Sequence, residues 1–419
     1  MRTHTTAASS PEPVRHGTRP PAAQAIRAVL AALTAVAVLL PQGSAAFDRE
    51  APPRVTAVRP LPSLTGDFAE YAAHGGHGGP ASHWTGGDST YSARTPAGEL
   101  WIFSDTFLGT VRPDGSRAPV TGGGTGDTTP FVHNSFVLWS AARGHGPRTV
   151  TGRSPSGRPT AVVTDDRDWY WARAALPRPA DGGTDVVYAR YARTGPGPLD
   201  VVRRGNALAR FRRGDFTRPE SLTPLPSATR TAWGAWLERG PGGTYVYGTE
   251  PAPSGGGHYL RLARVTGIDL RAAWQYRTAD GSWSPDESRA ARLTGADGRA
   301  LRTADEVSVV RHGGWYALVT QRADEPFSAE LQLAWSRAPG GPFTRPVGVY
   351  RAPEAGPTGS YRDRNVFAYN AHEHPELARP GELVVSYNVN SLAPDDVIRD
   401  ASIYRPRFVR IALAPPAHR

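Results

Sequence analysis

The sequence lacks two residue types entirely, because its 419 residues include no cysteine and no lysine. Without cysteine the chain can form neither disulfide bonds nor thiolate metal sites, so packing alone has to stabilise the fold. Without lysine all 48 basic residues are arginines, and the 38 acids leave a formal charge of +10. The arginines are dispersed, so we expect no nucleic-acid partner, although attraction to anionic cell-wall polymers stays open.

Long apolar runs are also absent, apart from one near the start of the chain. Residues 28–40 are apolar, follow an arginine, and lead into a helix-breaking stretch that ends in the small residues Ser44 and Ala46. This pattern is typical of a secretory signal peptide over residues 1–46, with Phe47 as the first mature residue. The run is shorter than the about 20 residues that cross a bilayer. We therefore expect a secreted protein without stable membrane insertion, an uncleaved anchor being the alternative.

Turn-forming and aromatic residues, by contrast, are abundant. The chain has 46 Gly and 40 Pro spread over its length, with 11 Trp, 15 Tyr and 12 Phe. This composition favours many short strands joined by turns, with enough aromatic volume for a sizeable core. No sustained 3.6-residue period is visible after the signal, so we expect no helix longer than about four turns.

The predicted strands recur as one unit: a strand, a Gly-containing turn, an aromatic-rich strand, and then one or two more. Five such units are predicted, at residues 86–140, 168–211, 231–276, 306–350 and 366–413. Radial packing of five four-stranded antiparallel sheets would bury both faces of each sheet and leave only short outer edges. We therefore predict an all-β fold, a five-bladed β-propeller over residues 65–415. Residues 47–64 are predicted as a Pro/Arg-rich linker or a closing strand, and 416–419 as a tail.

The segment 84–109 predicts a hairpin with one acid on each strand. Its two strands are separated by turn residues that close one end. Asp88 precedes the first strand and Asp105 follows the second, so both carboxylates should share the other end. Gly86 and Gly87 would allow another backbone to approach closely. The alternative is that each aspartate merely caps a turn.

Further candidate residues begin or end the predicted inner strands. A third acid, Glu306, begins the first strand of the fourth unit, where a solvated strand start is the alternative. Side chains suited to binding sugar hydroxyls or rings are His133, Asn134, Trp233, Asn370, His372, His374 and Asn388. No third ligand accompanies His372 and His374 at metal spacing, so we expect no metal or other cofactor and leave open a structural divalent cation. Expected to fill the space between sheets are Trp139, Trp171, Trp236, Trp315 and Trp335.

Several motifs resemble those of a known group. They are GDSTYSARTPAGELWIFSDTFLG (87–109), HNSFVLW (133–139), DEVSVVRHGGWYALVTQ (305–321), LAWSRAPGGPF (333–343) and YNAHEHPELARPGELVVSYNVN (369–390). They resemble secreted bacterial five-bladed β-propeller proteins catalogued as domains of unknown function, among which endo-D-arabinanases have been recognised. More distantly, they are similar to arabinanase, xylosidase and β-fructosidase propellers. The resemblance implies catalytic carboxylates at the starts of innermost strands, which Asp88 and Glu306 match. Those enzymes carry their general acid on the third blade, where this chain has Thr231, Ala232 and Trp233.

Cleavage of a glycosidic bond needs one protonated acid and one carboxylate. Carboxylates crowded at the end of a propeller would repel one another, which raises the pKa of one of them. We therefore predict a monomeric, secreted glycoside hydrolase with a carbohydrate substrate, arabinan-type by resemblance. Asp88 is predicted as nucleophile or base, and Asp105 or Glu306 as the acid. The alternative is a non-catalytic carbohydrate- or protein-binding module, because a fold does not decide its function.

Overall fold

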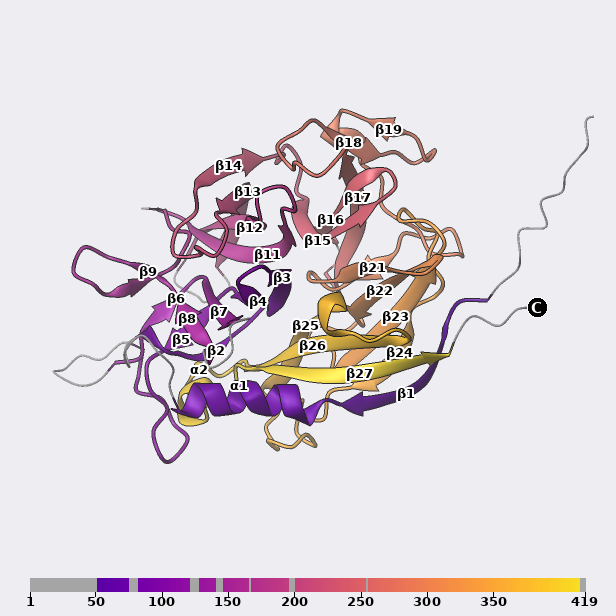
Figure 1. The fold of residues 1–419 in the computed structure, drawn as a ribbon. Helices are drawn as coiled ribbons and strands as arrows, with labels where there is room; N and C mark the ends of the chain where they lie inside the picture. Colours follow the sequence, from indigo (N-terminus) through magenta and orange to yellow (C-terminus); the bar gives the residue numbers. More distant parts are fainter. Residues whose placement is uncertain are drawn as a thin grey trace, which may run out of the picture. The chain divides into compact units, whose positions relative to one another are not determined.

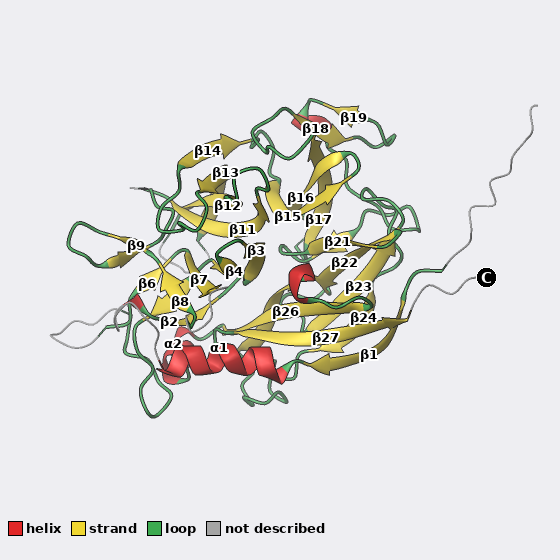
Figure 2. Cartoon of the chain, in the orientation of Figure 1, coloured by secondary structure: helices red, strands yellow, loops and turns green. Residues whose placement is uncertain are grey.

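The computed structural model describes residues 51–74, 82–120, 128–140, 146–165, 167–195, 200–253 and 255–414. The predicted signal peptide and tail lie outside these residues. The described residues belong to one compact unit. Its secondary structure is mostly β, which confirms the all-β part of the predicted fold (Figure 2). Within the described ranges, no helix is long and apolar enough to cross a membrane.

Most strands belong to sheets of four or more strands that follow the chain in order (Figure 1). The first sheet contains β3 (Tyr91–Thr95), β4 (Gly98–Phe103), β7 (Ser135–Ser140) and β8 (Arg148–Val150). The second contains β11 (Trp169–Pro177), β12 (Thr184–Arg193), β13 (Val201–Phe211) and β14 (Ser221–Leu225). The third contains β15 (Ala232–Gly240), β16 (Gly243–Pro251), β17 (His258–Val265), β18 (Trp274–Arg277) and β19 (Trp283–Ser284), with β20 (Arg302–Thr303) beside β17.

The remaining sheets include the end of the chain and two smaller elements. The fourth sheet contains β21 (Ser308–His312), β22 (Trp315–Gln321), β23 (Glu330–Ser336) and β24 (Val347–Arg351). The fifth contains β25 (Val366–Glu373), β26 (Glu382–Ser391), β27 (Pro406–Ala414) and β1 (Arg54–Pro60). Smaller pairings join β2 (Trp84–Gly87), β5 (Thr106–Leu108) and β6 (Phe131–Val132), and β9 (Gly152–Arg153) with β10 (Pro159–Thr160). Short helices are α2 (Pro394–Arg399), η2 (Glu287–Arg289) and η3 (Pro375–Leu377).

The first strands of the five sheets lie beside one another in chain order. β3 contacts β11, β11 contacts β15, β15 contacts β21, and β21 contacts β25. The fifth sheet returns to the first, because Nε2 of His372 in β25 lies 3.0 Å from the carbonyl oxygen of Thr90, just before β3. The starts of β3 and β21, just after Asp88 and Glu306, are thereby brought to a common side of the sheets. We call this side the acid rim.

Part of the predicted linker is a strand. β1 pairs antiparallel with β27, from Arg54 opposite Ala414 to Pro60 opposite Val409. Residues 54–60 are therefore the closing strand, not a linker, because the edge of β27 supplies their backbone groups with hydrogen-bond partners.

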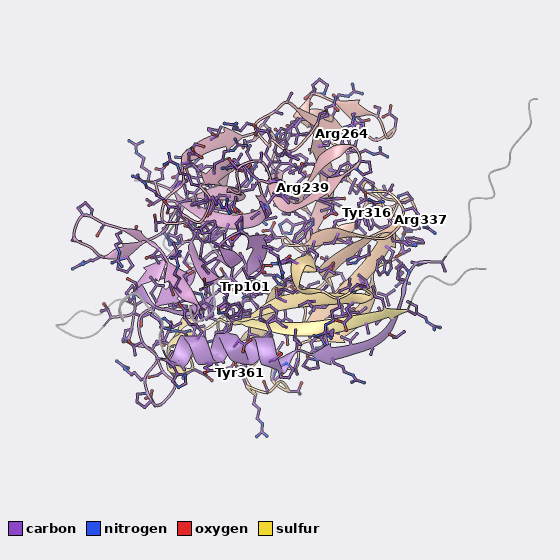
Figure 3. All side chains as sticks on the ribbon, in the orientation of Figure 1. Trp101, Arg239, Arg264, Tyr316, Arg337 and Tyr361 are labelled. Atoms are coloured by element: carbon purple, nitrogen blue, oxygen red, sulfur yellow. The ribbon has the colours of Figure 1, made fainter. Side chains whose placement is uncertain are left out.

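The helix α1 (Pro62–His74) follows this strand and was not predicted at that place. Its 13 residues stay within the expected limit of about four turns. The ring of Phe68 is fully buried and lies 5.0 Å from Trp101 of β4 and 5.6 Å from Phe408 of β27. Trp101 is labelled in Figure 3. The helix thus covers the place where the first and fifth sheets meet, and its apolar stripe supplies the contact.

Candidate active site

Asp88 and Asp105 lie opposite each other at a break in one antiparallel ladder. β3 and β4 pair on one side of the acids, and β2 and β5 pair on the other. Between these pairings, the N–H of Asp88 donates to the carbonyl of Asp105 at 3.1 Å, and the N–H of Ser104 donates to the carbonyl of Asp88 at 3.1 Å. The predicted hairpin and the proximity of its two acids are confirmed. The ladder continues past the acids, however, and does not open there.

The residues that follow Asp88 adopt an uncommon backbone conformation. Ser89 has φ 66° and Thr90 has φ 55°, in the left-handed region that residues other than glycine rarely occupy. Each such residue costs on the order of 1–3 kcal/mol and persists only where its surroundings hold it. Ser89 Oγ lies 2.9 Å from Ser104 Oγ and donates to Glu306 Oε1 at 2.6 Å. The break is therefore tied to the start of the fourth sheet.

Two predicted substrate contacts instead support this break. Nδ2 of Asn388 donates to the carbonyl of Gly87 at 3.1 Å and to Oγ1 of Thr90 at 2.9 Å. His372 contacts the carbonyl of Thr90. Both side chains are fully buried, so the prediction that they bind substrate is wrong. Their hydrogen-bonding groups face the 87–90 backbone and fix the direction in which Asp88 points.

Two tyrosines hold the carboxyl group of Asp88. The hydroxyls of Tyr369 and Tyr404 both donate to Oδ2 at 2.9 Å. Oδ1 is buried without a hydrogen-bond partner among the described residues. Burial and then the charge of Asp105 raise the pKa of Asp88 to about 7, and the tyrosine hydroxyls oppose that rise. Asp88 can therefore hold a proton close to neutral pH.

Asp105 is partly exposed and meets different partners. Nε1 of Trp171 donates to its Oδ1 at 2.8 Å, and Nδ1 of His133 lies 2.8 Å from the same oxygen. The Asp105 side chain is 18% exposed and that of His133 is 34% exposed. His133 therefore lies beside Asp105, and its binding of substrate stays a prediction. Trp171, expected only to fill space between sheets, is a hydrogen-bond donor to an acid.

Glu306 joins the two aspartates but lies deeper. Its side chain is 8% exposed and accepts the hydrogen bond from Ser89. Burial raises the pKa of Glu306 to about 8, opposed mainly by the charge of Arg173, while the charges of Asp305 and Asp88 add to the rise. The three predicted acids thus form one interacting group, which we call the acid cluster.

A charged pair beside the acid cluster was missed at the sequence level. Nη2 of Arg173 donates to Oδ2 of Asp305 at 2.8 Å, and Oγ1 of Thr249 donates to Oδ1 at 2.8 Å. Arg173 is 3% exposed and Asp305 is 40% exposed. Burial raises the pKa of Asp305, but the charges of Arg173 and then His258 outweigh it and bring the pKa far below its ordinary value. The pKa values of the neighbouring acids Asp305 and Glu306 are therefore shifted in opposite directions. Such opposed shifts are common at functional sites.

The other predicted ligand-binding residues do not join this site. Asn134 is fully buried and bonds the backbone of Val163 and Tyr170. Trp233 is fully buried, and its Nε1 donates to Glu287 at 3.1 Å. His374 is fully buried against Ser92. These three predictions are wrong, because neighbouring sheets cover the strand positions concerned.

Asn370 differs from these three residues in being half-buried. Its backbone has φ 58°, at an irregularity in the pairing of β25 with β26 between Tyr369 and His372. It therefore lies one residue beyond a tyrosine that bonds Asp88.

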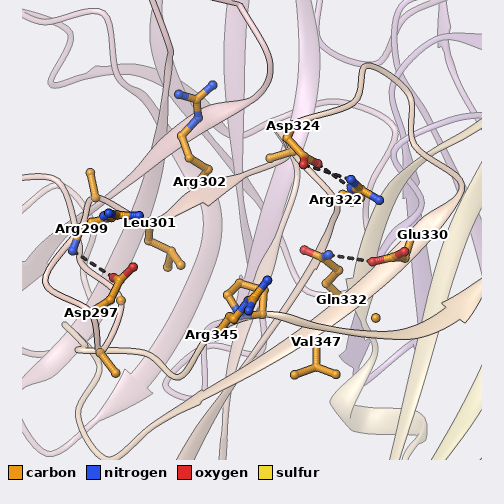
Figure 4. A pocket seen from close by; sticks show the side chains of 16 residues that line it. Asp297, Arg299, Leu301, Arg302, Arg322, Asp324, Glu330, Gln332, Arg345 and Val347 are labelled. Atoms are coloured by element: carbon orange, nitrogen blue, oxygen red, sulfur yellow. Dashed lines mark hydrogen bonds and ion pairs between the residues drawn. The ribbon is translucent and has the colours of Figure 1, made fainter.

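A cavity of about 1320 Å³ lies elsewhere and contains no member of the acid cluster. Figure 4 shows its charged lining, which includes Arg299, Arg302, Arg322 and Arg345. Arg322 pairs with Asp324 at 2.6 Å, and Arg302 donates to the carbonyl of Gly255 at 2.8 Å. The candidate site is therefore located by its acidic side chains and not by the volume of a cavity. Among the residues that the model describes, no group of three or more His, Asp or Glu could hold a metal ion.

Comparison with known proteins gives a family and a fold. The family model described as "Domain of unknown function (DUF5005)" matches residues 77–413. No curated protein matches the chain. A protein from Bacteroides ovatus, provisionally described as a hydrolase, superposes with a TM-score of 0.66 at 20% identity, covering 84% of this chain and 90% of that one. At that identity the likeness is one of fold.

Glycoside hydrolases are among the more distant solved structures. The GH43_1 enzyme from Xanthomonas citri, complexed with xylotriose, has a TM-score of 0.43 at 15% identity, over 85% of this chain and 94% of that one. A xylan beta-1,4-xylosidase from Bacillus halodurans has a TM-score of 0.41 at 13% identity, over 74% of this chain and 50% of that one. With TM-scores this low, neither carries an argument.

Proposed function

We propose that this chain, which belongs to the DUF5005 family of domains of unknown function, is a glycoside hydrolase acting through Asp88 and Asp105. One observation carries the proposal: two carboxyl groups meet across one backbone ladder in different surroundings. Burial favours the protonated form of Asp88, while Asp105 accepts a hydrogen bond at a partly exposed rim. A protonated acid beside a carboxylate is the combination that glycosidic cleavage requires.

The proposed roles reverse those predicted from the sequence. Asp88 is the general acid, because its raised pKa lets it carry a proton to the leaving oxygen. Asp105 is the nucleophile or the base that activates water, because its side chain is 18% exposed and Nε1 of Trp171 donates a hydrogen bond to its Oδ1. Glu306 is too deeply buried to meet a sugar, and it accepts a hydrogen bond from Ser89, the residue that follows Asp88.

We further propose that the five sheets are the blades of one five-bladed β-propeller built on four-stranded blades. Two observations support this: each predicted unit corresponds to one sheet, and the first strands contact one another in chain order. The third sheet carries additional strands, as an extension of its blade. The N-terminal strand β1 completes the fifth sheet, which ties the beginning of the unit to its end.

The remaining sequence expectations stay part of the proposal. We propose secretion after removal of residues 1–46, because of the apolar run that precedes Ser44 and Ala46. We propose action as a monomer on an arabinan-type carbohydrate, because of the motifs that resemble arabinanase-related propellers.

Release of reducing ends from arabinans, arabinogalactan and fructans tests the activity. We expect Asp88→Asn and Asp105→Asn each to lower kcat by at least about 100-fold, the size of a lost acid or base. Asp215→Asn is the matched control, because Asp215 is exposed and its side chain accepts hydrogen bonds from the nearby Thr217. Circular dichroism and Tm establish folding of each variant. Full activity in Asp88→Asn would overturn the assignment, and binding of a glycan without any cleavage would favour the non-catalytic module.

A further inference from the structure

Aromatic side chains extend outward from Asp105 on the second sheet. Trp171, which donates to Asp105, lies 4.4 Å from the ring of Tyr191 between centroids. Tyr191 stacks on Trp169 at 6.5 Å, and Trp169 stacks on His133 at 5.0 Å. All four side chains are half-buried. We call Trp169, Trp171 and Tyr191 the first aromatic platform.

A second row of rings extends outward from Asp88. Tyr369, which donates to Asp88, lies 5.2 Å from Phe367, and Phe367 lies 4.2 Å from Phe327. Tyr369 and Phe367 are half-buried, whereas Phe327 is 45% exposed. We call Phe327, Phe367 and Tyr369 the second aromatic platform.

Strand register places both platforms at the acid rim. Trp169 pairs with Tyr191 where β11 begins, and Phe367 stands where β25 begins. Ser308 of β21 pairs with Val319 near the end of β22, so the loop after β22 emerges where β21 begins, beside Glu306. That loop carries Phe327. The platforms therefore belong to sheets on either side of the hairpin that holds Asp88 and Asp105.

The backbone of Phe327 is evidence that its exposure has a use. Its φ is 51°, in the left-handed region, where a bulky side chain is a genuine outlier. Such a conformation costs on the order of 1–3 kcal/mol and is concentrated at functional sites. Because the Phe327 ring is exposed, its packing in the core does not account for the strained backbone.

We propose that the two aromatic platforms bind sugar rings on opposite sides of the acid pair, so that the ligand is a polysaccharide segment running past Asp88 and Asp105. This inference rests on the proposed function. The flat apolar face of a sugar ring can cover an aromatic ring, while the tyrosine and tryptophan polar groups remain bonded to the acids. A ligand of one or two sugars would reach one platform only, whereas a longer chain would contact both.

Affinity electrophoresis in native gels containing arabinan, arabinogalactan or inulin tests the platforms. The Asp88→Asn protein is used as background so that the polymer is not consumed. We expect at least one polymer to retard this protein, and we expect Phe327→Ala and Trp169→Ala each to weaken binding roughly threefold to tenfold, as for the loss of one aromatic contact. The control is Ile268→Ala, because Ile268 is 46% exposed in the loop after β17, at the end of the third sheet remote from the start of β15.

The outcomes separate this inference from the proposed activity. Unchanged retardation in either platform variant, or no retardation by any of the three polymers, overturns the platforms. If both variants bind more weakly as expected but the wild type releases no reducing ends from the bound polymer, the result supports the platforms and overturns the hydrolase. Cleavage by the wild type, with an unchanged KM when Phe327→Ala and Trp169→Ala are each made in the protein that retains Asp88, leaves the hydrolase standing and overturns the platforms.

Discussion

The hydroxyl of Tyr404 donates a 2.9 Å hydrogen bond to Oδ2 of Asp88, across a sequence separation of 316 residues. Tyr369 donates to the same oxygen from β25. These donors lower the pKa of Asp88, whereas burial and the charge of Asp105 raise it to about 7. The proton affinity of an acid in the first sheet is therefore adjusted by residues near the strands of the fifth.

Replacing Tyr404 with Phe should shift the pH dependence of activity upward. The variant loses one donor that favours the charged form of Asp88, so the pKa of Asp88 rises further. If Asp88 is the acid, it then keeps its proton to higher pH, and the alkaline fall of kcat/KM moves up from about 7 by as much as about one pH unit. A pH profile on a cleaved polysaccharide measures this. Tyr361→Phe is the control, because its hydroxyl bonds Ser402 and Arg407. A downward shift in Tyr404→Phe would refute the assignment of Asp88 as the acid.

Replacing Arg173 with Met should destabilise the protein in a pH-dependent way. Arg173 is buried, and its loss removes the main ionic partner of Asp305 and leaves His258 at 3.6 Å. We expect the free energy of unfolding to fall by about 2–4 kcal/mol at pH 7, somewhat below a fully buried pair because Asp305 is 40% exposed. The pKa of Asp305 is depressed in the folded state, so its stabilising contribution is present above its unfolded pKa and is lost as the pH falls.

Urea unfolding at neutral pH and below about pH 4 measures that difference. The deficit of Arg173→Met should shrink at the lower pH, because the unfolded chain binds a proton at Asp305 there, whereas the folded wild type, with its depressed pKa, does not. Arg218→Met, at an exposed position, is the control and should change little at either pH. A deficit that grows on acidification would contradict the role of the pair.

Replacing Gly86 with Ala should destabilise the acid hairpin. A Cβ atom there would lie 2.5 Å from Nη2 of Arg117 and 2.6 Å from the carbonyl oxygen of Tyr404. We expect a loss of about 1–3 kcal/mol, typical of overpacking, and reduced activity because Tyr404 also bonds Asp88. Gly66→Ala is the matched control, since a Cβ in that part of α1 meets nothing within 4 Å. It should stabilise the helix by about 0.5–1 kcal/mol. Equal Tm changes in the two variants would show that close approach at Gly86 is not required.

Local patterns in the sequence predicted much of the fold, and they named the three acids of the acid cluster and His133. The hairpin with Asp88 and Asp105 followed from strand alternation and turn residues, which act over a few positions. The five units followed in the same way, and each corresponds to one sheet. The helix α1 escaped this reading because its apolar stripe is short, with buried Phe68, Tyr71 and Ala72.

The tertiary structure alone decided which side chains surround the acids. Tyr369, Tyr404 and Trp171 reach Asp88 or Asp105 from other sheets, and no local pattern marks a hydrogen bond across 281, 316 or 66 residues. Residues predicted at strand ends also differ in exposure. His133 contacts Asp105 and is partly exposed, whereas the next residue, Asn134, is fully buried. Alternation places successive side chains on opposite faces, but only the packing of a neighbouring sheet determines which face is covered.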